Sequence, residues 1–272
     1  MRALVEAVRP DLLRQVTPLV GEDPFARVDE STRFAQPAIF CASLAGWERV
    51  RDQVDPVAFA GHSLGELTAL VAAGALDERD ALRLVVLRGL LMAISGEDAG
   101  GGTMLALLGT TPAHAAALAA HHGVSLANDN APGQVVLSGA PDRLAAVRDE
   151  AAAEGLRTID LDVAGAFHSP QMQEAVVPFR EALDEMEFRT PDVPVISCAT
   201  ALPFADPRAE LAEALVRPVR WRETMLALAA DGVQAFVDAG PGRVLAKLAP
   251  RCVPQAGAAS LDMLLGDDRA AA

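Results

Sequence analysis

Several residue types are scarce in this sequence. Its 272 residues include three cysteines, no tyrosine and one lysine, Lys247. Cys41, Cys198 and Cys252 lie far apart and form no C-x-x-C pair, which argues against a disulfide framework or a metal site and is typical of the reducing cytoplasm. No uncharged apolar run outside alanine-rich amphipathic segments reaches the roughly 18 residues of a membrane span. Charges also interrupt residues 1–16, so no signal-peptide core is expected.

Basic residues are fewer than acidic residues. Lys and Arg number 23 against 37 Asp and Glu, which gives a net charge of −14 and an isoelectric point near 4.7. Without a basic run, the chain lacks the charge on which general nucleic-acid binding depends. The apolar fraction of 51% nevertheless supplies a sizeable core, which excludes a disordered acidic chain. At this length, one large domain with a smaller insertion is expected.

The order of the predicted elements indicates an α/β protein with a parallel sheet. A short apolar run at 57–60 precedes G-H-S-L-G at 61–65 and a helix at 66–73, so strand, tight turn and helix follow one another. Further elements of this part are helices at 2–20, 36–50, 77–95, 170–187, 208–216 and 221–231, strands at 194–198 and 234–238, and a closing helix. The small, polar tail after Val253 is expected to fray.

A second pattern begins after the triple glycine at 100–102. Predicted strands at 104–108, 124–127, 134–138 and 157–163 alternate with one helix that ends near residue 122 and another at 142–154. This β-α-β-β-α-β order is typical of a ferredoxin-like fold. We therefore predict a small inserted subdomain over residues 103–164, between the two segments of a large α/β domain, 1–102 and 165–272.

The G-x-S-x-G motif places Ser63 where a nucleophile is expected. Gly61 and Gly65 fit this reading because a sharp strand-to-helix turn leaves no room for side chains on either side. The turn exposes the serine Oγ and directs the Leu64 N–H toward the oxyanion of a tetrahedral intermediate. The alternative is an ordinary turn with a capping serine, but the predicted strand and helix on either side favour the nucleophile.

His168 is the preferred candidate for the base that such a serine needs. His62 adjoins Ser63 in sequence and cannot easily reach Oγ from the required side. His114, His121 and His122 fall on a helix of the small subdomain, where they are expected to be solvated or satisfied by local hydrogen bonds. His168 precedes Ser169-Pro170, a helix N-cap followed by proline at the first helical position. It would then lie on a loop beside a cleft and take the serine proton; a surface loop histidine is the alternative.

Arg88 is unusual because its predicted helix, residues 82–94, is apolar on nearly every face. A guanidinium cannot lose its proton, so a buried one needs an anion. A bidentate clamp on a substrate carboxylate would satisfy it. The alternatives are an arginine that extends to solvent or one that pairs internally with an acidic residue.

Six motifs occur in order along the chain: GHSLGE (61–66), VVLRGLLM (85–92), NDNAPGQVVLSG (128–139), GAFHSPQM (165–172), PVRWRETM (218–225) and VDAGPGRVL (237–245). Together they resemble malonyl-CoA:acyl carrier protein transacylases, including the acyltransferase domains of fatty-acid and polyketide synthases. The resemblance extends from about Gln36 to Pro250. It implies an α/β-hydrolase-like large domain with a ferredoxin-like insertion.

The resemblance also implies roles for individual residues. Ser63 is then the nucleophile and His168 its base, held by backbone carbonyls, while Arg88 clamps the malonyl carboxylate. Leu64 supplies an oxyanion N–H, and Phe167 disfavours an α-methyl branch, a preference worth about 1–3 kcal/mol. Met92, Gln36 and Asn130 would line the same pocket. The alternatives are core packing for Met92, the start of a helix for Gln36 and a turn for Asn130.

The sequence departs from the family pattern at two places. Members of the family begin with a strand and an F-P-G-Q-G loop whose glutamine N–H is the second oxyanion donor, and this sequence contains no such motif. Loss of one donor typically lowers kcat about 10²–10³-fold. In the family, L-x-x-Q-L and a few more residues precede the segment that matches 218–221, and their carbonyls help to orient the histidine. Here Leu215-Val216-Arg217 leads directly into Pro218.

The sequence thus predicts a malonyl-type acyltransferase that needs no cofactor. Its substrates would be malonyl-CoA, a CoA thioester, and the phosphopantetheine thiol of an acyl carrier protein, with a ketosynthase or another synthase component as a further partner. Because carrier proteins are generally acidic, we expect a basic patch from Arg217, Arg220, Arg222, Arg243 and Lys247. Two alternatives are a serine hydrolase or thioesterase, for which a mid-chain His168 is unusual, and an impaired acyltransferase that acts as a carrier-protein-binding module.

Overall fold

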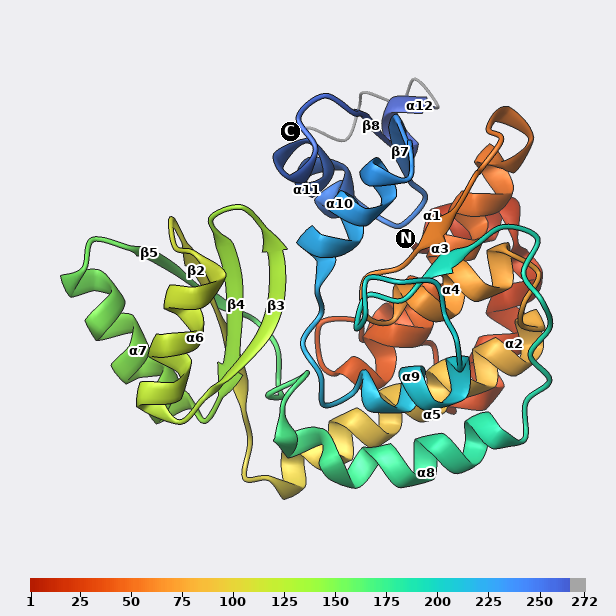
Figure 1. Cartoon of the computed structure of the whole chain (residues 1–272). Coiled ribbons are helices and arrows are strands. Elements are labelled where there is room, and N and C mark those ends of the chain that lie inside the picture. Colours follow the sequence, from red (N-terminus) through yellow and green to blue (C-terminus); the bar gives the residue numbers. More distant parts are fainter. Residues whose placement is uncertain (265–272) are drawn as a thin grey trace.

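The computed structural model describes residues 1–264 and combines a mainly helical part with a smaller part built on a four-stranded sheet (Figure 1). Helices that share the main core are α1 (Arg2–Val8), α2 (Pro10–Val20), α3 (Thr32–Val50), α4 (Gly65–Ala72), α5 (Glu78–Asp98), α8 (Gln173–Asp184) and α9 (Pro207–Glu213). Three short 3-10 helices are η1 (Pro24–Ala26), η2 (Arg51–Gln53) and η3 (Pro170–Met172). None of the described helices is long and apolar enough to cross a membrane.

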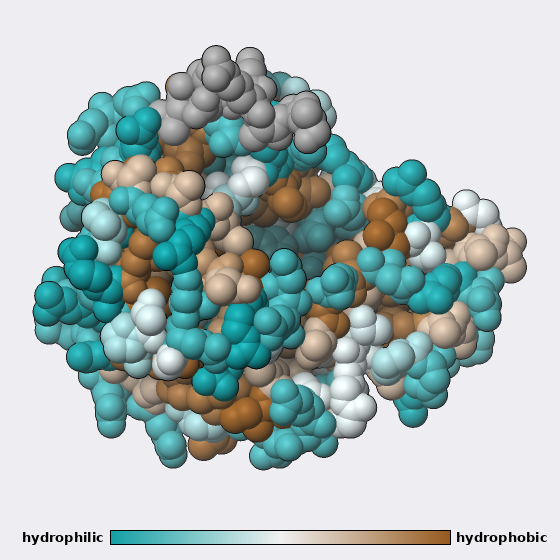
Figure 2. All heavy atoms as spheres, turned by 180° about the vertical axis from the view of Figure 1, so that it is seen from behind, coloured by the Kyte–Doolittle hydropathy of each residue, from teal (hydrophilic) through white to brown (hydrophobic). Residues whose placement is uncertain are grey.

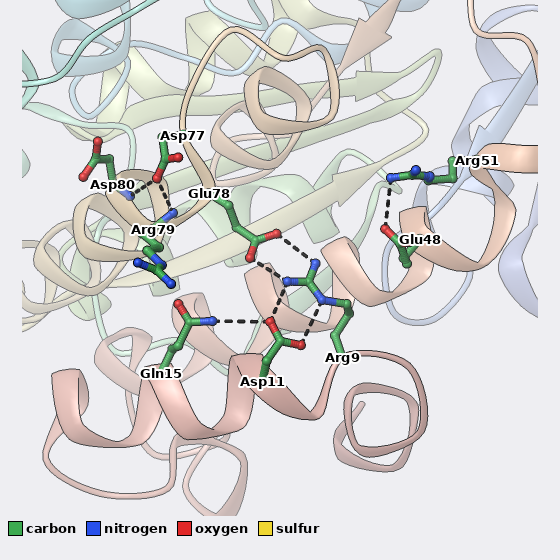
Figure 3. Close-up of polar contacts among 9 residues, drawn as sticks. All are labelled: Arg9, Asp11, Gln15, Glu48, Arg51, Asp77, Glu78, Arg79 and Asp80. Carbon is green, nitrogen blue, oxygen red and sulfur yellow. Dashed lines mark hydrogen bonds and ion pairs between the residues drawn. The ribbon is translucent and has the colours of Figure 1, made fainter.

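The N-terminal amphipathic segment, expected as one helix over 2–20, is divided into α1 and α2 at Pro10. Proline has no N–H to continue the ladder, and Arg9 before it leaves the helical region with φ −135° and ψ 61°. The Arg9 Nη2 atom lies 2.7 Å from Asp11 Oδ2 and 2.6 Å from Glu78 Oε1, at the start of α5 (Figure 3). These ion pairs hold the break between the two helices against α5.

Helix α3 begins earlier than predicted because Ser31 caps it. The Ser31 Oγ accepts a hydrogen bond from the Arg33 N–H at 3.2 Å, and the helix runs from Thr32 with Pro37 inside it. Gln36, expected at the helix start, therefore lies within the helix on its buried side. This position directs its side chain toward α5 and the site described below.

The parallel sheet of the larger part consists of two separate pairs. Strand β1 (Phe59–Ala60) pairs with β6 (Val195–Ile196), and β7 (Ala235–Asp238) pairs with β8 (Gly257–Ser260). No described strand joins the two pairs, so the predicted sheet is not continuous in residues 1–264. The expectation that the tail frays after Val253 was wrong for residues 257–264, which form β8 and α12 (Leu261–Leu264), and its remainder, 265–272, lies outside the described residues. Pairing with β7 gives this weakly patterned segment its order.

A second core is built mainly from the C-terminal quarter of the chain, whose two helices lie next to β7 and β8 (Figure 1). It is enclosed by α10 (Trp221–Ala230) and α11 (Val244–Cys252), and Trp221, Met225 and Leu248 are buried in it. At the start of α10, this core approaches the loop that carries Ser63, because the Trp221 ring lies 5.5 Å from the His62 ring.

The smaller part has the strand order β3-β4-β2-β5, and every neighbouring pair is antiparallel. Its elements are β2 (Thr103–Leu108), α6 (Pro112–His122), β3 (Ser125–Ala131), β4 (Gln134–Gly139), α7 (Pro141–Ala153) and β5 (Arg157–Leu161). Both helices cover one face of the sheet, where Leu105, Leu107 and Leu137 form a core with Leu118 and Leu144 (Figure 1). The opposite face and the edge strand β3 are turned toward the rest of the molecule.

Candidate active site

Ser63 occupies the turn between β1 and α4, as predicted, with a φ of +53°. Residues other than glycine rarely adopt this left-handed backbone conformation, so the surrounding turn must enforce it. A Cβ on Gly61 would lie 1.9 Å from the Gly65 carbonyl carbon, which explains why the turn requires glycine at position 61. The expectation that Gly65 also lacks room was wrong, because a Cβ there meets no atom within 4 Å.

Ser63 and His168 are in hydrogen-bonding contact, with 2.8 Å between Oγ and Nε2. The Nδ1 atom of His168 lies 2.8 Å from the carbonyl oxygen of Ala214 and 3.1 Å from that of Arg217. Carbonyl oxygens only accept hydrogen bonds, so Nδ1 carries the proton and Nε2 is free to accept the serine hydroxyl. The shortened segment before Pro218 therefore still presents two carbonyl groups to the histidine.

The backbone of His168 is also left-handed, with φ +57°. Ser169 stabilises this conformation through its side chain, because its Oγ donates to the Ala166 carbonyl at 2.6 Å and accepts from the Gln171 N–H at 3.2 Å. The second bond is the predicted N-cap, here at the start of η3. The imidazole is buried, not at the surface.

Arg88 is buried on α5 and contacts the same serine. Its Nη2 donates to Ser63 Oγ at 3.1 Å and its Nη1 donates to Gln36 Oε1 at 2.7 Å. The Gln36 amide nitrogen in turn lies 2.8 Å from Thr32 Oγ1 and 3.3 Å from Met92 Sδ. Gln36 and Met92 are thus brought to the site, where Gln36 contacts Arg88, Thr32 and Met92, and Met92 contacts Gln36.

Burial and the positive charge of Arg88 shift the pKa values of the ionisable groups at the site. Burial, and next the charge of Arg88, lower the pKa of His168 to about 3. Burial alone lowers the pKa of Arg88 to about 10, which leaves it charged at neutral pH. Burial raises the pKa of Glu66, whose Oε1 accepts the Cys198 N–H at 2.7 Å, to about 7. A neutral imidazole and a positive guanidinium therefore flank the serine.

Asn130 is close to the site, but its side chain is bound by another residue. Its Oδ1 lies 2.9 Å from His62 Nε2, and the His62 ring is 5.5 Å from the Trp221 ring. A cavity of about 790 Å³ beside these residues reaches Ser63 and is lined largely by apolar side chains of α3, α10 and α11. Seen from behind, the molecular surface is hollowed between its two parts, with apolar side chains at the rim (Figure 2).

Phe167 and Leu64 adjoin His168 and Ser63 in the sequence. Phe167 is half-buried and contacts the cores of both parts, and a Cβ on Gly165 would come within 2.5 Å of its ring. Gly165 therefore allows the ring to pack against the loop. The Leu64 N–H has no acceptor within the described residues, so it is available to an oxyanion.

The expected basic patch is largely neutralised by ion pairs. Arg217 pairs with Glu213, Arg220 with Glu223, Arg222 with Asp129 and Arg243 with Asp262. Lys247 lines a different hollow, of about 880 Å³, together with Arg157 and Arg251. The charge count of a sequence segment does not show these pairs, which balance the positive charge of each of the four arginines.

An ion pair near the site, between Arg222 and Asp129, was not predicted from the sequence. Arg222 Nε lies 3.1 and 2.9 Å from the two carboxylate oxygens of Asp129, and its Nη2 lies 2.7 Å from Oδ2. The Asp129 N–H also donates to the Val219 carbonyl at 2.8 Å. These bonds join β3 to the segment that follows Ala214 and Arg217. Both residues lie in quoted motifs, but nothing in their spacing indicates the contact.

Comparison with known proteins gives consistent matches. A family model described as the acyl transferase domain matches residues 2–267. The malonyl CoA-acyl carrier protein transacylase of Bacillus subtilis is 41% identical over 227 residues, which cover 79% of this chain and 70% of that protein. The polyketide biosynthesis protein ThaF of Burkholderia thailandensis is 36% identical over 275 residues, which cover 96% of this chain. The chain spans only 24% of that longer relative.

Solved structures also share the fold of this chain. The crystal structure of malonyl-CoA:acyl carrier protein transacylase from Xanthomonas oryzae superposes with a TM-score of 0.89 at 32% sequence identity. The match covers 100% of this chain and 94% of that one. The mixed α/β fold with parallel and antiparallel sheets is therefore shared along the whole described chain.

Proposed function

Because this chain belongs to the acyl transferase domain family, we propose that it transfers a malonyl group from malonyl-CoA to the phosphopantetheine thiol of an acyl carrier protein. The observation that carries the proposal is the contact of one serine Oγ with both a neutral imidazole and a buried guanidinium. The imidazole is the base that the nucleophile needs, and the guanidinium suits an acyl group that ends in a carboxylate.

The proposed first half-reaction acylates Ser63. His168 Nε2 takes the hydroxyl proton as Oγ attacks the thioester carbonyl, and the Leu64 N–H faces the developing oxyanion. The carbon–sulfur bond then breaks, and the imidazolium returns its proton to the departing CoA sulfur. A malonyl ester on Ser63 and free CoA thiol remain.

The second half-reaction runs in the opposite direction with a different thiol. His168 takes the proton of the carrier phosphopantetheine thiol, and the sulfur attacks the serine ester. The carbon–oxygen bond to Ser63 breaks, and the serine recovers its proton from His168. The acyl group leaves as a thioester of the carrier protein, so no oxidant, metal or other reactant is consumed.

Arg88 gives this scheme a physical basis for selecting malonyl groups. In the free enzyme its charge disfavours protonation of His168, and the guanidinium donates to the nucleophile itself. A bound carboxylate would neutralise that charge and accept the Nη2 hydrogen bond, which frees Oγ and makes His168 a stronger base. A neutral acyl group supplies neither effect, so its transfer would be slower.

The proposal extends to the organisation of the chain. Residues 103–164 would be a ferredoxin-like inserted subdomain, and 1–102 with 165–272 an α/β-hydrolase-like large domain. The strand order β3-β4-β2-β5 with two helices on one face supports the first assignment. The strand, serine turn and helix at 59–72 support the second.

The carrier protein would approach the groove between the small sheet and α11. Arg157, Lys247 and Arg251 line this groove and suit the acidic surface that carrier proteins generally present. Lys247→Glu is expected to slow transfer to carrier protein several-fold and to leave serine acylation unchanged. Equal loss in the two half-reactions would contradict this placement.

Intact mass after brief incubation with malonyl-CoA tests the proposed reaction. We expect one malonyl adduct on the wild-type protein and none on Ser63→Ala. Arg88→Gln should lose malonyl labelling at least about 10²-fold, as expected when an interaction with a charged group is removed, but keep labelling by acetyl-CoA. Equal labelling of Arg88→Gln by both thioesters would favour a hydrolase or thioesterase. No adduct on a folded wild-type protein would favour a carrier-binding module.

A further inference from the structure

Two imidazoles and a carboxylate converge on the helices of the small part, outside the catalytic contacts. His121 and His122 close α6, and Glu150 lies on α7. Glu150 Oε2 lies 2.7 Å from His122 Nε2 and 3.2 Å from His121 Nδ1. Adjacent helical residues reach the same point because one uses the nitrogen near its backbone and the other uses the far nitrogen. The potential ligand atoms all lie within 4.8 Å of one another.

We propose that His121, His122 and Glu150 bind one divalent transition-metal ion of the Zn²⁺ type, with water completing a four-coordinate site. Ligand atoms about 2.0–2.2 Å from a tetrahedral ion lie about 3.3 Å from each other. The two separations from Glu150 Oε2, 2.7 and 3.2 Å, are close to this value, and the two imidazole nitrogens, which lie within 4.8 Å of each other, would approach by side-chain torsion. Imidazole with carboxylate suits zinc, copper or nickel, whereas magnesium and calcium prefer all-oxygen ligands.

The electrostatic setting favours a cation at this point. The last turn of α6 presents carbonyl groups at the negative end of the helix dipole, and Glu150 adds a full negative charge. Gly123, which ends the helix with φ +63°, already attracts one cation, because Arg143 Nη1 donates to its carbonyl at 3.0 Å. Two neutral imidazoles and one carboxylate would leave the metal-loaded cluster with a single positive charge.

The cluster combines a fixed ligand with an accessible one. The His122 side chain is 15% exposed, and its contact with Glu150 holds the ring in place, whereas the His121 side chain is 69% exposed. An ion can therefore enter from solvent and keep a water ligand. Because α6 and α7 pack against each other on one face of the sheet, the ion would join two helices and stabilise the small part (Figure 1).

The same two helices contain a matched control. His114 Nε2 lies 2.9 Å from Glu154 Oε2, and His114 Nδ1 already contacts Thr110 Oγ1 at 3.1 Å. This pair offers one imidazole and one carboxylate, which is too few ligands for tight binding. Thiol ligands do not compete at the protein surface, because the three cysteines are buried.

Calorimetric titration of the full chain with Zn²⁺ tests the proposal, with circular dichroism to confirm that each variant is folded. We expect one site in the wild-type protein and at least about tenfold weaker binding for His122→Ala and for Glu150→Gln. His114→Ala should bind within twofold of wild type. Zn²⁺ at 100 times its dissociation constant should also raise the wild-type Tm by several degrees, reversibly on addition of EDTA.

Three results would overturn the proposal. They are no Zn²⁺ binding by the wild-type protein, binding that His122→Ala and Glu150→Gln leave unchanged, and equal loss in His114→Ala. X-ray absorption at the zinc edge gives an independent check. Two imidazole rings and oxygen at about 2.0–2.2 Å are expected, and a single imidazole or a sulfur ligand would exclude this site.

Discussion

Two loops of this protein each carry a catalytic candidate in left-handed backbone, and they differ in what positions its side chain. The Ser63 turn closes on itself, because the Gly65 N–H donates to the His62 carbonyl at 2.9 Å and the Glu66 N–H donates to the Ser63 carbonyl at 3.1 Å. The Ser169 side chain stabilises the His168 backbone locally, but the His168 imidazole is held by carbonyl groups 46 and 49 residues further along the chain. The geometry of the first loop is set locally, whereas the orientation of the imidazole in the second depends on tertiary packing.

The difference determines how each loop can be damaged. A turn that closes on itself is sensitive to a single added atom at its closest approach, and changes elsewhere leave it intact. A loop held by remote carbonyls tolerates local changes better. It loses function when the distant segment moves, even if no residue of the loop is altered. Four predictions test this contrast, from the largest expected effect to the smallest.

Gly61→Ala should have the largest effect. The new Cβ would lie 1.9 Å from the Gly65 carbonyl carbon and 2.1 Å from its oxygen, and neither backbone atom can move without opening the turn. We expect the free energy of unfolding to fall by about 3 kcal/mol or more. Gly65→Ala is the matched control, and it should be neutral or stabilising by up to about 1 kcal/mol because alanine favours the first turn of α4. Urea denaturation measures both, and equal losses would show that the turn is not closed at Gly61.

His168→Gln should remove the base and leave the Ser63 turn intact. We expect kcat to fall about 10²–10⁴-fold, since general-base catalysis contributes that much, with little change in KM for malonyl-CoA. Steady-state kinetics with an unchanged far-ultraviolet circular dichroism spectrum would separate this loss from unfolding. A decrease of less than tenfold would mean that another group takes the serine proton.

Asp129→Asn should loosen the His168 loop from a distance. It removes the carboxylate that pairs with Arg222, next to the segment whose carbonyls hold the imidazole. We expect kcat to fall about three- to tenfold with KM unchanged, the effect of about 1 kcal/mol. Glu223→Gln is the control, since its pair with Arg220 is exposed and joins the N-cap of α10 to its first turn. If the two variants lose equal activity, the Arg222–Asp129 ion pair does not position the histidine.

The pH dependence of the wild-type protein should show the smallest change. The pKa of His168 is lowered to about 3, so the imidazole stays neutral as the pH falls through the range in which free histidine becomes protonated. We expect kcat/KM for malonyl-CoA to stay within twofold between about pH 5.5 and 7.5. Arg88→Gln removes a charge that lowers this pKa, so its acid limb should lie at higher pH. A wild-type acid limb near pH 6.5 would contradict the burial argument.

The sequence predicted much of the site because its signals are local or ordered along the chain. The G-x-S-x-G motif with its flanking strand and helix located the Ser63 turn, and the six motifs indicated the family that the comparisons confirm. The helix break at Pro10 and the early start of α3 were missed, because a proline and a capping serine outweighed the hydrophobic periodicity. The requirement for Gly65 was also wrong, since only Gly61 makes the close approach.

Contacts between remote segments decided the rest. The amino-acid sequence by itself determined the chemistry available, which is a serine in a glycine-bounded turn, a histidine at a helix cap and an arginine in an apolar helix. Only the tertiary structure decided that Arg88 lies between Gln36 and Ser63, and that four of the five expected basic residues are paired with carboxylates. It also decided that the tail forms β8. A local pattern reports which face of an element is buried, whereas these pairings depend on which distant segment lies against that face.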